Sequence, residues 1–205
     1  MTAPLAAGDR EGSRQSLIAT LQAAYSGERA AGYAYRGHWR SVSDAGERAR
    51  IREIEEEEWH HRRLVGEMLA ALGAGPRRRL ELRAVLIGRT LGVLCHVAPW
   101  FAPMYGAGRL ESRNVKEYED AARHAAACGH HEFVDCLLTM AEVEWEHEAY
   151  FRSKVLGHPL CRLVGVWSPA PPKATIRSPS SPKAAPSVDQ GRVESAVARP
   201  PVASR

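Results

Sequence analysis

The stretch IREIEEEEWHHRRLVGEMLAAL, residues 51–72, decides the fold. Its apolar residues recur every three or four positions, which places them on one face of an α-helix. This apolar face comprises Ile51, Ile54, Val65, Met68 and Leu72. Glu58 and His61 interrupt the apolar face. Glu57 and His60 form a second Glu-x-x-His pair, but they lie on a mostly charged face. The pattern therefore predicts that the first pair is buried and the second is solvated.

Residues 131–156 repeat this arrangement. Glu144 and His147 again form a Glu-x-x-His pair on an apolar helical face. The apolar members of that face are Leu137, Met140 and Phe151. An ionised carboxylate that faces a core costs on the order of several kcal/mol unless a positive group meets it. Two buried pairs therefore predict either a shared cation or a well-connected hydrogen-bond network.

Two further glutamates, Glu28 and Glu111, also lie on apolar helical faces. Each is followed seven residues later by a tyrosine, Tyr35 or Tyr118, which is two turns along the same face. The single glutamate precedes the Glu-x-x-His glutamate by 30 residues in the first half of the chain and by 33 in the second. These spacings form a pseudo-repeat of two helical hairpins.

One glutamate from each of two helices and Glu-x-x-His from each of two others form the ligand set of di-iron carboxylate bundles. Carboxylate with imidazole suits iron or manganese, and six ligands on two iron ions leave positions where dioxygen can bind. The predicted ligands are Glu28, Glu58, His61, Glu111, Glu144 and His147. Tyr35 and Tyr118 either tune these ligands through hydrogen bonds or only pack in the core.

A helical bundle whose acids lie on the surface is the alternative, since a lone Glu-x-x-His is more often an exposed i, i+3 pair. The other nearby acids are expected to be solvated: Glu55, Glu56, Glu57, Glu142 and Glu146.

The whole pattern predicts an all-α fold, a ferritin-like four-helix bundle with an extra apolar connector helix. The predicted helices cover residues 13–39, 44–72, 110–127 and 131–156, and the connector covers residues 80–104. Asp44 is a predicted N-cap, and Gly129 is a predicted helix end. The predicted domains are a flexible N-terminus at residues 1–12, a di-iron bundle at 13–160, and a disordered tail rich in Pro, Ala and Ser at 161–205.

The apolar connector has two interpretations. Its length approaches that of a membrane span, but Arg89, His96 and two prolines argue against a span. The simpler interpretation is a helix buried in the bundle. The alternative is a helix that lies on a membrane surface, because the run Arg77-Arg78-Arg79 just before it suits anionic head groups.

Composition limits the functional classes. The chain has 205 residues and a net charge of +4, while residues 157–205 alone hold seven Lys/Arg and two Asp/Glu. The basic excess therefore belongs to the tail, and no nucleic-acid binding is predicted. The four cysteines lack CxxC spacing, and residues 1–12 lack the features of a secretory signal. We therefore expect a reduced, cytoplasmic setting, and a homo-oligomer stays open.

These motifs resemble those of the demethoxyubiquinone hydroxylase family of di-iron proteins. The family's first motif, a ligand Glu followed by small residues and Tyr-x-Gly-Gln, matches Glu28 and residues 35–38, with His38 in place of Gln. Its other motifs match residues 58–61, 111–118 and 144–147. The resemblance covers about residues 15–151 and omits the tail. Further departures are Ala24-Tyr25, where the family usually has Asp-His, and Lys116-Glu117, which replaces a His-rich pair.

The resemblance implies a monooxygenase with two iron ions held by the six residues named above. It implies that dioxygen and an external reductant such as NADH serve to hydroxylate the ring of a quinone-like lipid, a step in ubiquinone biosynthesis. It also implies a peripheral position on the inner face of a membrane. Two alternatives stay open. One is another ferritin-like di-iron oxidase or peroxidase, although rubredoxin-like CxxC pairs are absent. The other is a non-enzymatic helical interaction module.

Overall fold

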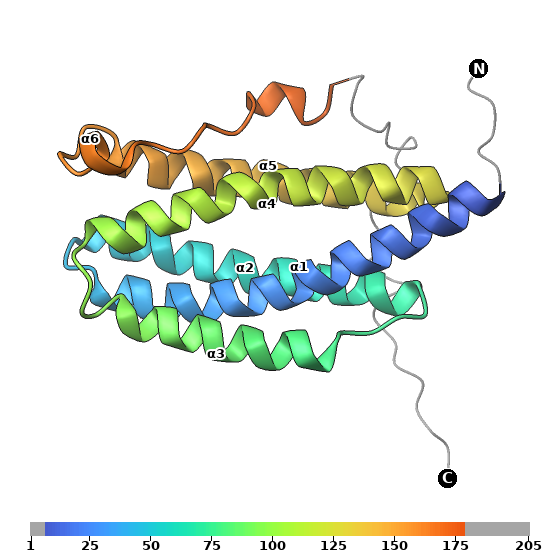
Figure 1. The fold of residues 1–205 in the computed structure, drawn as a ribbon, viewed down its shortest axis with the longest axis horizontal. Helices are drawn as coiled ribbons and strands as arrows, with labels where there is room; N and C mark the ends of the chain where they lie inside the picture. The colour runs from blue at the N-terminus through green and yellow to red at the C-terminus, as the bar shows by residue number, and fades with distance from the viewer. Residues whose placement is uncertain (1–6, 179–205) are drawn as a thin grey trace, which may run out of the picture.

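The computed structural model describes residues 7–178 as an all-α protein (Figure 1). Residues 1–6 and 179–205, and with them part of the predicted tail, lie outside the described residues. The helices are α1 (Ala7–Ser41), α2 (Ala45–Ala71), α3 (Arg78–Leu94), α4 (Phe101–Cys128), α5 (His131–Val155) and the short α6 (Cys161–Val164), followed by a 3-10 turn, η1 (Lys173–Thr175). The predicted all-α class is confirmed. Residues 7–12, predicted to be flexible, belong to α1.

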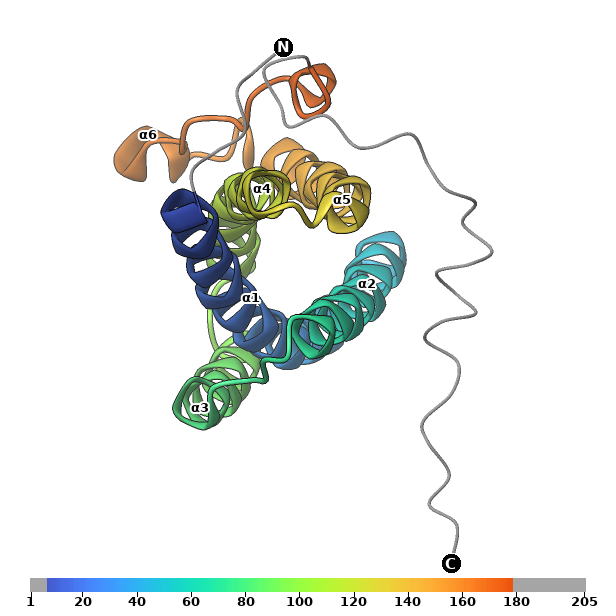
Figure 2. The ribbon, with the colours of Figure 1, turned by 90° about the vertical axis from the view of Figure 1, so that its right-hand side faces the viewer.

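Four long helices, α1, α2, α4 and α5, surround a common core (Figure 2). α1 and α2 form one hairpin, and α4 and α5 form the other. The Arg14 side chain near the start of α1 donates to the carbonyl of Leu72 at the end of α2, as an antiparallel pair requires. α3 runs along the outside of α1 and carries the chain from one hairpin to the other, so it forms the predicted connector helix.

The core consists of two apolar clusters, one toward each end of the bundle. The first includes Leu17, Leu21, Val65, Leu69, Val115 and Leu137. The second includes Ile51, Ile54, Phe101, Met104 and Phe151. On every long helix, the residues between these clusters are the glutamates and histidines that the sequence singles out. The apolar periodicity therefore positions a polar layer midway along the bundle.

Helix ends follow the predicted signals at two positions. Asp44 caps α2, since its carboxylate accepts the backbone N–H of Glu47 at 2.8 Å. Gly129 ends α4 in the left-handed conformation with φ of 92°. The predicted start of the fourth long helix at residue 110 is wrong, because α4 begins at Phe101. Pro103 falls in its first turn, where a backbone N–H needs no intrahelical partner.

The large apolar side chains of α3 face away from the bundle. Leu82, Leu86 and Val93 are 65%, 69% and 67% exposed. The prediction of a connector buried in the bundle is therefore wrong. Among residues 7–178, no helix is both long enough and apolar enough to cross a membrane.

Small residues form the contact between α3 and α1. A Cβ atom added at Gly88 would overlap the backbone of Ala30, and one added at Gly37 would overlap the backbone of Gly92. Ala84, Gly88 and Gly92 share one face with a spacing of four, the pattern that lets two helix backbones approach closely. α3 therefore turns its glycine face to the protein and its leucine face outward.

Residues 165–178, here called the strap, pack against α4 and α5. The Trp167 indole N–H donates to Glu148 Oε1 at 2.8 Å, and its ring covers Gly108. Ile176 is fully buried in the first apolar cluster, and Arg177 forms an ion pair with Asp135 at 2.6 Å. The prediction of disorder from residue 161 onward is therefore wrong for the part of the tail that the structure describes.

Candidate metal centre

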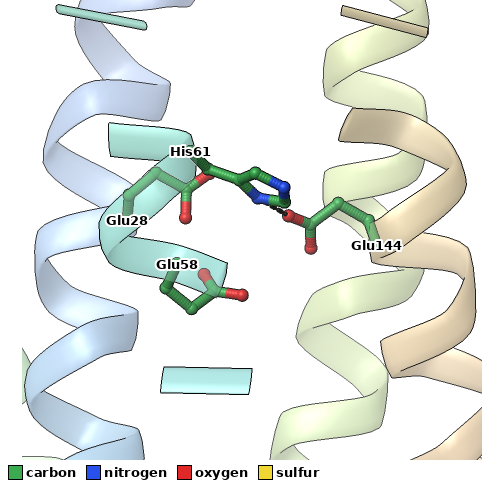
Figure 3. A group of neighbouring side chains, drawn as sticks. All are labelled: Glu28, Glu58, His61 and Glu144. Atoms are coloured by element: carbon green, nitrogen blue, oxygen red, sulfur yellow. Dashed lines mark hydrogen bonds and ion pairs between the residues drawn. The ribbon is translucent and has the colours of Figure 1, made fainter. Parts of the chain in front are cut away.

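The six predicted ligands converge in the polar layer, and no one of them is more than 4% exposed. They comprise Glu28 of α1, Glu58 and His61 of α2, Glu111 of α4, and Glu144 and His147 of α5. Figure 3 shows four of them, with three carboxylates and one imidazole turned toward the middle of the bundle. The helix period places these side chains inward, and the hairpin topology brings them to one level.

The six side chains form two overlapping groups. Glu28 and His61 belong to the first group, here called site one, and Glu111 and His147 belong to the second, site two. Glu58 and Glu144 are members of both. Within each group, one potential ligand atom per residue lies within 4.8 Å of the others. A dinuclear centre with bridging ligands requires carboxylates that belong to both sites, and these two residues meet that requirement.

The histidines of the two hairpins reach across to the shared carboxylates. His61 Nδ1 lies 2.9 Å from Glu144 Oε1, and His147 Nδ1 lies 3.3 Å from Glu58 Oε1. Each histidine thus meets the glutamate of the other Glu-x-x-His pair. The site therefore has an approximate two-fold relation between the halves of the chain.

The two tyrosines obey the same relation. Tyr35 of α1 donates its hydroxyl to Glu111 of α4, and Tyr118 of α4 donates to Glu28 of α1. Each tyrosine thus serves the glutamate of the opposite hairpin rather than the one seven residues before it. Both rings are also buried in the core, so each side chain combines the two roles that the sequence allows.

Several inward-facing atoms have no hydrogen-bond partner among the described residues. They are both carboxylate oxygens of Glu58, Oε2 of Glu28 and Nδ1 of His147. A buried, unpartnered carboxylate is costly unless a cation or proton meets it. The orphaned atoms and the donor set of four carboxylates and two imidazoles fit two iron or manganese ions.

The electrostatics of the six residues also favour bound metal ions. Burial, followed by repulsion from neighbouring carboxylates, holds the pKa of Glu58 and of Glu111 well above the usual range. The same causes raise the pKa of Glu144 to about 7. Burial lowers the pKa of His61. Burial also opposes a charge on His147, but its hydrogen bond to Glu57 and the nearby carboxylates raise its pKa. Without a cation, the carboxylates must keep protons, which bound metal ions would displace.

Two glutamates differ from the sequence prediction, and one residue of the centre was not predicted. Glu57, expected to be solvated, is only partly exposed and accepts the Nε2–H of His147 at 2.7 Å. Asn114, which the sequence analysis missed, donates to Glu111 Oε2 at 2.8 Å. Its position three residues after Glu111, the same offset as in Glu-x-x-His, is the signal that could have revealed it. Glu55 is also buried rather than solvated, and bonds Arg36, Trp39 and Trp59.

His38, which stands where the motif of the resembling family has Gln, is 2% exposed. Its ring stacks with Tyr35 and Phe151 at centroid distances of 6.3 and 5.9 Å. Burial lowers the pKa of His38 to about 4, so the ring is neutral at pH 7. The neutral ring packs against these two aromatic rings, and its Nε2 has no hydrogen-bond partner among the described residues.

Comparisons with protein-family models, with curated proteins and with solved structures find no match to this chain. The functional argument therefore rests on the residues of the centre and on their geometry.

Proposed function

We propose that this chain is a di-iron monooxygenase of the demethoxyubiquinone hydroxylase type. The observation that supports it most is the convergence of four glutamates and two histidines, several of them unpartnered, into two groups that share two carboxylates. The proposed reaction places one atom of dioxygen in a ring C–H bond of a quinone and releases the other as water. Two electrons from an external reductant such as NADH and two protons complete the balance.

The protein's own residues would hold and orient the reacting groups. Glu58 and Glu144 lie where they can bridge, while Glu28 and Glu111 can each bind one ion. When bound, the two iron ions would supply the redox chemistry by which dioxygen reacts. Tyr118 and its counterpart Tyr35 orient the terminal carboxylates by donating to them.

The surroundings would keep the reaction dry. The two apolar clusters close the polar layer from both ends of the bundle. Exclusion of water strengthens electrostatic interactions inside the site and protects reactive species from side reactions. Without metal, burial and the charge of Glu28 hold the pKa of Glu144 at about 7, so binding of the ions would release its proton.

The outer face of α3 supports the proposal that the substrate is a lipid and that the protein lies on a membrane surface. It exposes large apolar side chains, while its small residues face α1. Its exposed apolar residues include Leu82, Leu86, Ile87, Leu91, Val93 and Leu94. Arginines at positions 77–79, 83 and 89 lie before and among them. Apolar residues flanked by arginines fit a bilayer surface with anionic head groups, such as the inner face of a cell membrane.

Vesicle co-sedimentation tests this position. The full chain should sediment with anionic phospholipid vesicles and much less with neutral ones. The double variant Leu86→Ser, Val93→Ser should stay in the supernatant, because both residues belong to the exposed surface of α3. Leu17 is buried and is not part of that surface. Equal supernatant fractions of wild type and double variant would contradict membrane contact through α3.

The activity is tested with iron-loaded protein, a chemical reductant, dioxygen and a short-chain demethoxyquinone. We expect a product heavier by one oxygen atom, which derives from labelled dioxygen, and its loss in Glu58→Ala. Glu56→Gln is the matched control, because Glu56 is an exposed neighbour that pairs with Arg52. Rapid consumption of peroxide without quinone oxidation would instead favour a peroxidase, and an inert, metal-free chain would favour the helical interaction module.

A further inference from the structure

The two sites of the centre differ in what supports their ligands. At site two, His147 donates Nε2–H to Glu57 Oε2 at 2.7 Å. Its other nitrogen, Nδ1, faces Glu58 at 3.3 Å and has no hydrogen bond within the described part of the chain. A carboxylate on the outer nitrogen fixes the tautomer that leaves the inner lone pair free for a metal, and it makes the imidazole a stronger ligand.

Glu57 is itself held in place. Arg50 lies two turns earlier on the same side of α2. Its Nη1 lies 3.2 Å from Glu57 Oε2 and 2.7 Å from Glu53 Oε2. An ion pair on the carboxylate keeps Glu57 ionised and limits its rotation. The pair therefore gives His147 a charged partner in a fixed position.

The terminal carboxylate of site two is supported on both oxygens. Glu111 accepts from Tyr35 at Oε1 and from Asn114 at Oε2, the second at 2.8 Å. Asn114 also lies 3.3 Å from Oε2 of the shared residue Glu144. In site one, Glu28 accepts from Tyr118 at Oε1, but its Oε2 has no partner among residues 7–178.

The two-fold relation shows why site one lacks this support. Val143 precedes Glu144 as Glu57 precedes Glu58, and Ala31 follows Glu28 as Asn114 follows Glu111. Neither valine nor alanine has a polar side-chain atom. Both of these differences between the two halves therefore favour site two.

We infer that the site formed by Glu111 and His147 binds its metal ion more tightly than the site formed by Glu28 and His61, and that Glu57 and Asn114 are the positioning residues responsible. The first ion thus enters site two and the second enters site one. This inference rests on the proposed dinuclear centre. Loss of such outer partners costs roughly 10- to 100-fold in metal affinity in other proteins.

The test is a Co²⁺ titration of the full, metal-free chain, followed by visible absorption and by competition with a chelator. Wild type should bind two ions in two resolved steps. Glu57→Ala should weaken the tighter step by roughly 10- to 100-fold and leave the weaker step unchanged. Glu57→Gln, which keeps an acceptor, should recover part of the loss. The control is Glu53→Gln, because Glu53 bonds the same arginine, is exposed, and has no place in the centre.

Two further variants assign the steps and guard against misfolding. Glu28→Ala should remove the weaker step and keep the tighter one, and Asn114→Ala should weaken the tighter step independently of Glu57. Circular dichroism of each metal-free variant should match the wild type. Two bound ions with affinities that Glu57→Ala and Asn114→Ala do not change would overturn the inference alone. A wild-type chain that binds neither Co²⁺ nor Fe²⁺ would overturn the proposed function together with it.

Discussion

In the metal-free protein, raising the pH from about 4.5 to about 7 should lower the free energy of unfolding. Glu144 is fully buried, and burial followed by the charge of Glu28 raises its pKa from 4.5 to about 7. Over this range the folded protein keeps a proton that the unfolded chain releases. The resulting stability is fully present below the unfolded pKa and is lost as the pH rises through the folded one.

The size of the effect follows from the shift. One pKa unit corresponds to about 1.4 kcal/mol, so Glu144 alone should remove about 3 kcal/mol between these limits. The pKa values of Glu58 and Glu111 are raised as well, chiefly by burial, so these two residues add to the loss. His147 adds to it through its raised pKa, and His61 opposes it through its lowered pKa. The carboxylates titrate as a coupled set, so the transition is broad.

Urea denaturation in the presence of EDTA, at several pH values from 5 to 8, measures this dependence. Glu144→Gln, which cannot ionise, should be more stable than wild type at pH 7 and should show a flatter profile by about 3 kcal/mol. Glu56→Gln should follow the wild type, because Glu56 is exposed. A wild-type stability that stays flat or rises between pH 5 and 7, in parallel with Glu144→Gln, would refute the reasoning.

Two other predictions concern the packing around the centre. Trp167→Ala should destabilise the protein by about 2–4 kcal/mol, because the ring covers Gly108 and its N–H donates to Glu148. Urea denaturation, with Trp167→Phe for comparison, measures this loss. An unchanged midpoint for the alanine variant would contradict the packed strap. Gly37→Ala should lower the free energy of unfolding by about 1–3 kcal/mol, because the added Cβ would overlap the backbone of Gly92. Gly27→Ala, at a position with open space, should be neutral or stabilising by about 0.5–1 kcal/mol. Thermal unfolding compares the two variants, and equal melting temperatures would contradict the close crossing of α1 and α3.

The inward position of the six candidate ligands could be predicted because it depends on helix period alone. Glu58 lies on the apolar face and Glu57 on the charged face, and the structure buries the first completely. Asp44 and Gly129 could likewise be recognised as helix ends, since capping is a local property.

The remaining features depend on tertiary contacts. The sequence of an apolar helix such as α3 does not reveal whether its leucines or its glycines pack against the neighbouring helix. In this structure Gly88 and Gly92 make that contact. The strap has a composition typical of disorder, yet Trp167, Ile176 and the ion pair of Arg177 anchor it. The hydrogen bond from His147 to Glu57 joins residues that are 90 positions apart in the chain, so no local pattern predicts it.

The most direct test of the central claim is the iron content of the chain purified from iron-supplemented cells, beside Glu58→Ala and Glu144→Ala. Both variants remove a carboxylate shared by the two sites. We expect about two iron ions per chain in the wild type and their loss in both variants. A wild type without bound iron, and with a stability that added metal does not change, would contradict the di-iron centre and leave a helical bundle whose buried acids serve another purpose.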